Sequence, residues 1–207
     1  MEINTNLFGG GSHCKVIIDI ILESKEYSIT SIVDQNPKKD FVFDIPVVNF
    51  EGVENFKDKP FIVTIGDNQS RKNVVEIIQA NYLTAIHPKA IVSRFSRVLE
   101  GTVVMAGAII NADAQIGRHC IINTGAIIEH ECVIDDFVHI CPNASIAGNV
   151  KVGEGSNIGI GASVIQGVSI GKWVVVGAGT VIIDDIPDYA VVVGIPGKII
   201  KFNKRND

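Results

Sequence analysis

Valine or isoleucine recurs at every sixth position of the chain, without a break, from Val92 to Ile182. A helix repeats about every 3.6 residues and a strand about every 2, so neither explains this period. A six-residue repeat instead indicates a parallel β-helix, in which each short strand buries its side chain only against stacked neighbours. The sixteen repeating residues, called anchors below, are Val92, Val98, Val104, Ile110, Ile116, Ile122, Ile128, Ile134, Ile140, Ile146, Val152, Ile158, Val164, Ile170, Val176 and Ile182.

Two further regularities accompany the anchors. The residue two positions earlier is mostly small, so we expect one large and one small inward residue on each flat side. These small residues are Ala90, Ser96, Thr102, Ala108, Ala114, Cys120, Ala126, Cys132, Ala144, Ser156, Ala162 and Thr180. Glycine follows the anchor at Gly117, Gly153, Gly159, Gly171 and Gly177, where we expect turns with a positive φ. Three six-residue sides would close a coil of eighteen, so residues eighteen apart should stack.

The period changes near residue 85, which predicts a first domain of residues 1–85 and a repeat domain of residues 86–207. The first domain alternates strand and helix patterns, which indicates a small parallel, Rossmann-like α/β sheet covered on both faces. Expected strands are Ile3–Phe8, Ser28–Val33, Pro46–Val48 and Phe61–Ile65, with helices after an N-cap at Ser12, near Glu51–Phe56, and after Asn68. Inward residues of the first and last helices should be Val16, Ile17, Ile20, Ile21, Val74, Val75, Ile77 and Ile78.

Composition excludes several classes of function. The net charge is −5 and no basic stripe is present, which argues against nucleic-acid binding. No apolar run approaches the roughly 18 residues of a membrane span, and no signal segment opens the chain, so we expect a cytoplasmic protein without membrane contact. The four cysteines (Cys14, Cys120, Cys132 and Cys141) lack disulfide or CxxC spacing, and we expect them to be reduced and structural.

A histidine and a glutamate adjoin in one of the predicted turns. His130 and Glu131 follow the anchor Ile128, and Gly148 lies eighteen residues after His130. A carboxylate fixes the tautomer of a neighbouring imidazole and stabilises the imidazolium, which suits a general base. Gly148 would leave space over the imidazole, and its N–H could point at a developing oxyanion. The sequence therefore predicts His130, Glu131 and Gly148 as catalytic residues.

The other histidines give weaker signals. His119 has no carboxylate neighbour and His87 stands at the domain junction, so we expect both to be structural. A zinc site, as in the γ-type carbonic anhydrases that use the same repeat, would need three converging ligands. His119, His130 and His139 occupy different registers of the coil, so we expect no metal.

Several segments resemble the bacterial sugar O- and N-acetyltransferases, the family of the sialic acid O-acetyltransferases and UDP-4-amino-sugar N-acetyltransferases. The resemblance covers both domains, and residues 128–140 contribute most of it. The matching segments are Ile128–Ile140 (IEHECVIDDFVHI), Ala147–Gly153, Ile158–Ala162, Val193–Lys198, Gly9–Lys15 and Ile65–Asn68. The resemblance implies a left-handed parallel β-helix, shaped as a triangular prism, and a homotrimer with active sites between neighbouring prisms.

The resemblance also implies roles for individual residues. The residue at His130 is the general base, and Glu131 raises its basicity. Acetyl-CoA is expected to contact His139, Asn157, Ile160, Gly177, Ala178 and Lys198. The first domain should bind the acceptor, a nucleotide sugar, through Gly11, Ser12, His13, Asp34, Gln35 and Gly66, which follow the predicted strands where open α/β sheets bind ligands. The family usually has Gly at Ser12 and often Asp at Gln35, so these positions bear on which sugar is bound.

These observations favour acetyl transfer from acetyl-CoA to the amine of a nucleotide-linked 4-amino sugar. No Ser or Cys adjoins His130 to form an acyl-enzyme, so direct attack is expected. Two alternatives remain open at this point. One is O-acetylation of a free sugar such as sialic acid, and the other is a non-catalytic scaffold that binds a nucleotide sugar.

Overall fold

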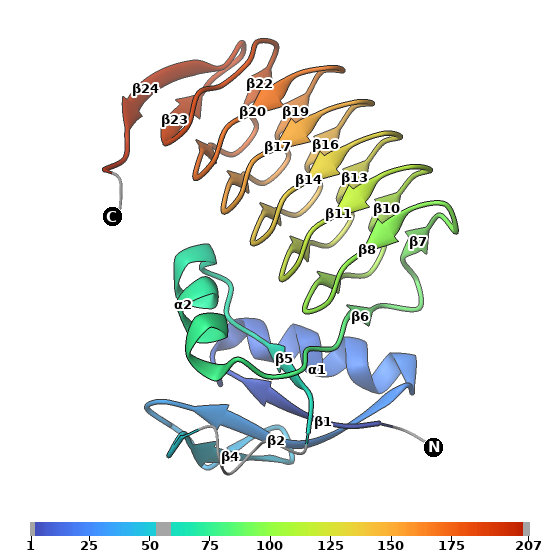
Figure 1. Ribbon diagram of the computed structural model, residues 1–207, viewed down its shortest axis with the longest axis vertical. Coiled ribbons are helices and arrows are strands. Elements are labelled where there is room, and N and C mark those ends of the chain that lie inside the picture. Colours follow the sequence, from blue (N-terminus) through green and yellow to red (C-terminus); the bar gives the residue numbers. More distant parts are fainter. Residues whose placement is uncertain (1–2, 53–58, 205–207) are drawn as a thin grey trace. The chain divides into compact units, whose positions relative to one another are not determined.

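The computed structural model describes residues 3–52 and 59–204, and the chain forms two compact units, Met1–Pro88 and Lys89–Asp207 (Figure 1). The first is an α/β unit and the second a solenoid of short parallel strands. The α/β-plus-β-helix fold class expected from the sequence is confirmed. None of the described helices is long and apolar enough to cross a bilayer.

The first unit contains a five-stranded sheet in the order β3-β4-β2-β1-β5. Its strands are β1 (Ile3–Phe8), β2 (Tyr27–Asp34), β3 (Phe41–Val42), β4 (Ile45–Asn49) and β5 (Phe61–Val63), and a short β6 (Ala85–Ile86) ends the unit. β4, β2, β1 and β5 run parallel, and β3 pairs antiparallel with β4. The helices are α1 (Ser12–Ser24) and α2 (Asn68–Ile78). Residues 53–56 of the helix expected near Glu51–Phe56 lie outside the described residues.

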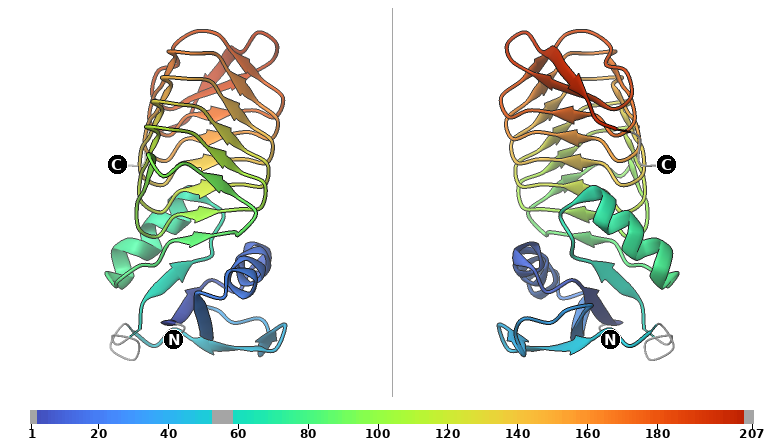
Figure 2. Two further views of the ribbon diagram at one scale, coloured as in Figure 1. Left: turned by 90° about the vertical axis from the view of Figure 1, so that its right-hand side faces the viewer. Right: turned by 90° about the vertical axis from the view of Figure 1, so that its left-hand side faces the viewer.

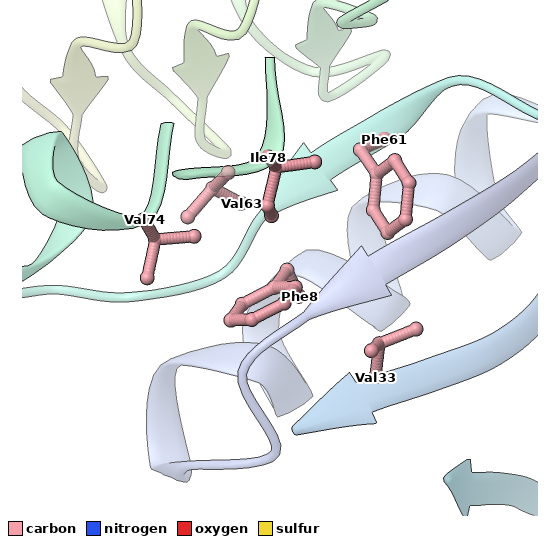
Figure 3. Close-up of a cluster of buried hydrophobic side chains, with 6 residues drawn as sticks. All are labelled: Phe8, Val33, Phe61, Val63, Val74 and Ile78. Atoms are coloured by element: carbon pink, nitrogen blue, oxygen red, sulfur yellow. The ribbon is translucent and has the colours of Figure 1, made fainter. Parts of the chain in front are cut away.

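One face of the sheet packs against α2. Phe8 of β1 makes an edge-on contact with the ring of Phe50, with centroids 5.3 Å apart. The side chains that bury this face come from three strands and the helix, and Figure 3 shows them converging: Phe8, Val33, Phe61, Val63, Val74 and Ile78. Because strand side chains alternate, Leu7, Ile32 and Ile62 are buried on the opposite side. The parallel strands are therefore buried on both faces, as the alternation of strand and helix patterns predicted.

The helix registers differ in part from the sequence expectation. In α1 the buried residues are Cys14, Ile17, Ile18, Ile20 and Ile21, whereas Val16 is 42% exposed. In α2 Ile77 is 51% exposed, and the buried stripe contains Asn68 and Arg71 beside Val74 and Ile78. The expectation was wrong for Val16 and Ile77, because the sequence pattern does not distinguish a hydrophobic residue at the edge of the buried stripe from one within it. Ser12 is also not the N-cap of α1: Gly11 is, and no side chain caps the helix.

The second unit is a stack of coils, as Figure 2 shows, and from β7 to β22 every strand pairs in parallel with a strand eighteen residues away. One face carries β7 (Ile91–Val92), β10 (Ile109–Ile110), β13 (Ile127–Ile128), β16 (Ser145–Ile146), β19 (Ser163–Val164) and β22 (Val181–Ile182). The second carries β8 (Arg97–Val98), β11 (Gln115–Ile116), β14 (Val133–Ile134), β17 (Lys151–Val152) and β20 (Ser169–Ile170). The third carries β9 (Val103–Val104), β12 (Ile121–Ile122), β15 (His139–Ile140), β18 (Asn157–Ile158), β21 (Val175–Val176) and β23 (Ala190–Val193).

The anchors fill the interior of the solenoid. From Val104 to Ile182 every anchor is buried, while Val92 and Val98 in the first coil are half-buried. The small residues two positions earlier are also inside, and several bind backbone carbonyls fifteen residues on. Thr102 Oγ1 donates to Gly117 O at 2.7 Å, and Ser156 Oγ donates to Gly171 O at 2.7 Å. Cys120 and Cys132 make the equivalent Sγ contacts, each at 3.1 Å, so they have the structural role expected of them.

The glycines after the anchors have a different purpose from the one expected. None of Gly117, Gly153, Gly159, Gly171 and Gly177 has a positive φ. A Cβ on Gly153 would lie 2.6 Å from the carbonyl carbon of Gly171 in the next coil, so close stacking excludes a side chain there. Positive φ values of 53–74° occur instead two residues later, at every corner from Gly101 to Gly179. Asp113, His119, Glu131, Phe137, Asn143, Asn149 and Trp173 adopt this conformation besides the glycines.

A hairpin closes the solenoid. β23 continues the third face by pairing in parallel with β21, and β24 (Lys198–Phe202) returns antiparallel to β23. The turn between them is the segment 194–197, part of the Val193–Lys198 segment that resembles the acetyltransferases.

The two kinds of glycine predict different costs of substitution. Gly153→Ala should lower the free energy of unfolding by roughly 3 kcal/mol, the upper end of the cost of overpacking. Gly167→Ala is the matched control, since its φ is +74° but nothing lies within 4 Å of an added Cβ. It should cost only about 1 kcal/mol, for the left-handed backbone. Urea unfolding measures both, and equal losses would contradict the stacking explanation.

Candidate active site

The predicted catalytic pair lies at the corner that follows β13. His130 Nδ1 is 3.1 Å from Glu131 Oε2, and both side chains are more than half exposed. This contact leaves Nε2 of the imidazole as the nitrogen that can accept a proton from a substrate. The φ of Glu131 is 59°, but equivalent residues at other corners share this conformation, so it is a property of the coil.

Gly148 lies against the imidazole, as the eighteen-residue spacing predicted. A Cβ at Gly148 would be 2.6 Å from Cε1 and 2.7 Å from Nε2 of His130. Any larger residue at this position would displace the ring. The structure therefore brings His130, Glu131 and Gly148 together.

The coil leaves backbone N–H groups unused at its corners. Around the catalytic corner the N–H groups of Glu129 and Glu131 donate to carbonyls of neighbouring coils. Those of Gly148, Ile160 and Ala178, each two residues after an anchor, make no hydrogen bond within the part of the chain that the structure describes. The residues expected to present backbone groups to the substrates are thus residues whose N–H is not used in the hydrogen bonds between coils.

His139 and Asn157 form part of an outward-facing column on the third face. They are direct partners in the pairing of β15 with β18. Asn123 Nδ2 lies 2.9 Å from His139 Nε2, and Asn157 Oδ1 accepts a 3.5 Å contact from Cys141 Sγ. Burial raises the pKa of the Cys141 thiol to about 11, so it is protonated at neutral pH. Sequence reasoning missed Asn123, because it lies sixteen residues before His139 and not the eighteen that stacking predicts.

The residues expected to bind acetyl-CoA lie on another part of the coil from His130. His139 and Asn157 belong to the third face, and Ile160 and Ala178 stand at the corner that follows it. Gly177 adjoins the hairpin, where an added Cβ would lie 2.8 Å from Val193, and Lys198 is the first residue of β24. A whole face of strands therefore separates the catalytic corner from the Ile160 corner within one chain.

All six residues expected to bind the acceptor line one pocket in the first unit. Its volume is about 360 Å³, and its lining comes from the carboxyl ends of β1, β2 and β5: Phe8, Gly9, Gly11, Ser12, His13, Asp34, Gln35, Thr64, Ile65 and Gly66. Asp34 is fixed by two backbone donors, the Gly10 N–H at 2.7 Å and the Asn36 N–H at 2.8 Å. This is the strand edge at which open α/β sheets bind ligands.

His13 has an unusual environment in this pocket. Burial, with a smaller effect from the Arg71 charge, lowers the pKa of His13 to about 4, so its imidazole is neutral at pH 7. Its Nε2 is buried and has no hydrogen-bond partner among the described residues.

A second pocket of about 520 Å³ shares Gly11, Ser12 and Asp34 with the first. It extends towards β3 and β4, and Lys15, Lys38 and Lys39 contribute to its lining. Sequence reasoning missed this pocket, because the segment 36–42 has no regular pattern. The two pockets together offer room for an elongated ligand.

The remaining histidines are buried. His119 stacks on Phe137 with ring centroids 5.3 Å apart and fills the space over Gly101, and His87 is 7% exposed. Within residues 3–52 and 59–204, no group of three or more His, Cys, Asp or Glu side chains is placed to hold a metal ion.

Known proteins show the same combination of units. Residues 4–78 match the family model described as the PglD N-terminal domain. UDP-N-acetylbacillosamine N-acetyltransferase of Bacillus subtilis is 42% identical over 111 residues, which are 50% of this chain. The match covers 51% of that protein, so about half the length of this curated relative is represented.

Two sets of solved structures match over nearly the whole chain. PerB from Caulobacter crescentus, in complex with CoA and GDP-perosamine, is 39% identical with a TM-score of 0.90, covering 96% of this chain and 97% of that one. The acetyltransferase domain of PglB from Neisseria gonorrhoeae, in complex with acetyl coenzyme A, is 33% identical with a TM-score of 0.89, covering 97% and 100%. The chain therefore belongs to the hexapeptide-repeat sugar acetyltransferases, and its second unit is their left-handed parallel β-helix.

Proposed function

We propose that this protein transfers the acetyl group of acetyl-CoA to the amine of a nucleotide-linked 4-amino sugar. The observation that carries the proposal is the exposed His130–Glu131 pair, 3.1 Å apart, with its imidazole lying over Gly148. The amine attacks the thioester carbonyl, and His130 Nε2 takes the proton that the nitrogen loses. The C–S bond then breaks, and the imidazolium returns that proton to the sulfur, so that CoA leaves as the thiol and the imidazole is again neutral. Glu131 orients the imidazole and stabilises its charged form.

Attack without an acyl-enzyme fits the surroundings of His130. Cys132 is the nearest thiol in sequence, but it is fully buried and its Sγ donates to Ala147 O inside the prism. Burial also raises the pKa of this thiol, which makes it a poor nucleophile. The free Gly148 N–H is positioned at the catalytic corner, where it can stabilise the developing oxyanion.

The donor site supports an assembly of three chains. His130 and the Ile160 and Ala178 N–H groups occupy different corners of one prism, so one chain cannot present both to the same acetyl group. A neighbouring prism can supply the second set, and a closed ring of three would form three equal sites. We therefore include a homotrimer, with acetyl-CoA bound between prisms, in the proposal.

The first unit supports the choice of a nucleotide sugar as acceptor. Its two adjoining pockets, of about 360 and 520 Å³, suit an elongated molecule better than a free monosaccharide. The Bacillus subtilis relative is named for a UDP-linked sugar and the Caulobacter crescentus structure holds GDP-perosamine. This favours N-acetylation over O-acetylation of a free sugar such as sialic acid. Acetyl-CoA and nucleotide sugars are cytoplasmic metabolites, so we propose that location and a role in building cell-surface polysaccharides.

An assay of thiol release from acetyl-CoA tests the reaction. The acceptors are UDP-, dTDP- and GDP-linked 4-amino sugars, the corresponding free amino sugars, and sialic acid. We expect rapid release with one nucleotide-linked amino sugar and slow release with its free form. Equal turnover of the two would contradict the proposed role of the first unit, and release only with sialic acid would favour the O-acetyltransferase.

Substitution of the catalytic pair should reduce kcat. His130→Ala removes the base and should lower kcat by about 10²–10⁴-fold, because this is the usual contribution of a positioned general base. Glu131→Gln keeps the imidazole and should cost less. Steady-state kinetics at saturating acceptor and calorimetric titration with acetyl-CoA separate chemistry from donor binding, which should be retained in both variants. A larger defect in Glu131→Gln than in His130→Ala would reverse the assigned roles.

The assembly can be measured directly. Sedimentation equilibrium should give about three times the chain mass of 22.3 kDa. Mixing His130→Ala chains with chains impaired in donor binding should restore part of the activity, since some sites would combine two intact halves. A fully active monomer would be incompatible with a site shared between prisms.

Asp34→Ala should weaken acceptor binding alone. The carboxylate is held by the Gly10 and Asn36 N–H groups at the edge of both pockets, so its loss disturbs the pocket and removes a ligand contact. A hydrogen bond of this kind contributes about 1–3 kcal/mol, or roughly 5–150-fold in KM for the sugar nucleotide. The KM for acetyl-CoA should change less than twofold. An equal rise in both would argue against separate sites.

A further inference from the structure

Arg71 is a charged residue in an apolar position. It stands on α2 with 1% of its surface exposed, in the stripe that packs against the sheet. Its Nη1 donates to Ile65 O at 3.0 Å and to Gly66 O at 3.1 Å, and its Nη2 donates to Asn68 Oδ1 at 2.8 Å. These three acceptors are neutral oxygens. Burying a guanidinium costs free energy, and these hydrogen bonds offset part of that cost.

The carbonyls that Arg71 binds belong to the wall of the acceptor pocket. Ile65 and Gly66 line that pocket, whereas Arg71 itself does not. The planar guanidinium reaches two consecutive carbonyls and the first residue of α2 at once, a geometry that lysine cannot reproduce. Arg71 therefore fixes the segment between β5 and α2 from behind the pocket.

His13 faces the same segment from α1. A Cβ on Gly66 would lie 3.9 Å from His13 Cγ, so imidazole and wall are in near contact. The buried His13 Nε2 is unpartnered among the described residues, and it is the polar atom that an acceptor could satisfy. Two carboxylates lie nearby: Asp34 lines the pocket, and Asp67 caps α2 through the Ser70 N–H. That hydrogen bond is the main cause that lowers the pKa of Asp67, and Arg71 lowers it further.

We propose that Arg71 is a positioning residue for acceptor binding: it holds the Ile65–Gly66 wall against His13 so that the pocket is preformed for the nucleotide sugar. This inference rests on the proposed function. Arg71 makes no contact with the substrate and acts only through the wall and the imidazole. Preforming a pocket improves affinity because less ordering is left to the binding step.

The test compares three substitutions around the guanidinium with one in the neighbouring core. Arg71→Lys keeps the charge, Arg71→Met keeps the volume, and Asn68→Ala removes one of the three acceptors. Val74→Ala is the matched control, since Val74 is 6% exposed on the same helix and belongs to the apolar cluster, but does not itself line the pocket or bind its wall. The best acceptor from the thiol-release assay is used as the probe, and each variant is first checked for folding.

We expect Arg71→Lys and Arg71→Met to raise KM for the acceptor by about 5–50-fold, a range that corresponds to one or two lost hydrogen bonds. Asn68→Ala should show a smaller rise, and kcat and KM for acetyl-CoA should stay within twofold. Val74→Ala should lower the unfolding midpoint without raising KM for the acceptor. NMR titration of His13 gives an independent readout: in Arg71→Met its pKa should rise from about 4, and burial should keep it below 6.5.

The outcomes separate this inference from the proposed function. If the unsubstituted protein turns over an acceptor but the foldable variants among Arg71→Lys, Arg71→Met and Asn68→Ala keep its KM, the inference is overturned and the function stands. The inference is also overturned if Val74→Ala raises KM as much as they do, because the effect would then be one of general stability. If no nucleotide-linked amino sugar is acetylated, the proposed function fails and the inference fails with it.

Discussion

Everything in the second unit depends on how closely successive coils stack. Each coil repeats after eighteen residues and hydrogen-bonds to the next along all three faces, and at some positions directly after an anchor this leaves no space for a side chain. Gly153 and Gly159 stand at such positions. The residues two positions later have a left-handed backbone conformation, which turns the chain round each corner. The same ladder determines which amides remain free. Donors one and three residues after an anchor are used, and the N–H between them points away from the ladder.

This constraint explains why a regular scaffold can carry chemistry. A side chain two or three residues after an anchor stands at a corner, close to the equivalent residue of a neighbouring coil and to a backbone position whose N–H does not pair with a backbone carbonyl. At most corners such residues only fill space, as His119 does over Gly101. At one corner the pair is His130 and Glu131, and the neighbour is Gly148. The proposed catalytic arrangement thus requires no departure from the coil.

The regular part of the molecule could therefore be predicted from the sequence, and the irregular part could not. The spacing of eighteen placed Gly148 over His130 and Asn157 beside His139. The same spacing did not explain the glycines after the anchors. We expected a positive φ at these glycines, but a repeat period shows which residues stack and says nothing about their backbone angles. In the first unit, Asn68 and Arg71 occupy buried positions that a hydrophobic pattern cannot reveal, and Ile77 is exposed. The lysine-lined pocket joins segments without any periodic signal.

The two units also differ in how they can specify a substrate. Under the proposed function, the β-helix offers backbone amides and short side chains on a rigid lattice to acetyl-CoA, the donor. The acceptor varies, and its pocket is built from loops at strand ends, where single residues can change without disturbing a stacked neighbour. Asp34 and Arg71 secure those loops by hydrogen bonds to backbone groups, and in the proposed function Ser12, His13 and Gln35, which line the pocket, are left to contact the ligand. Recognition of the sugar can then change while the catalytic corner stays fixed.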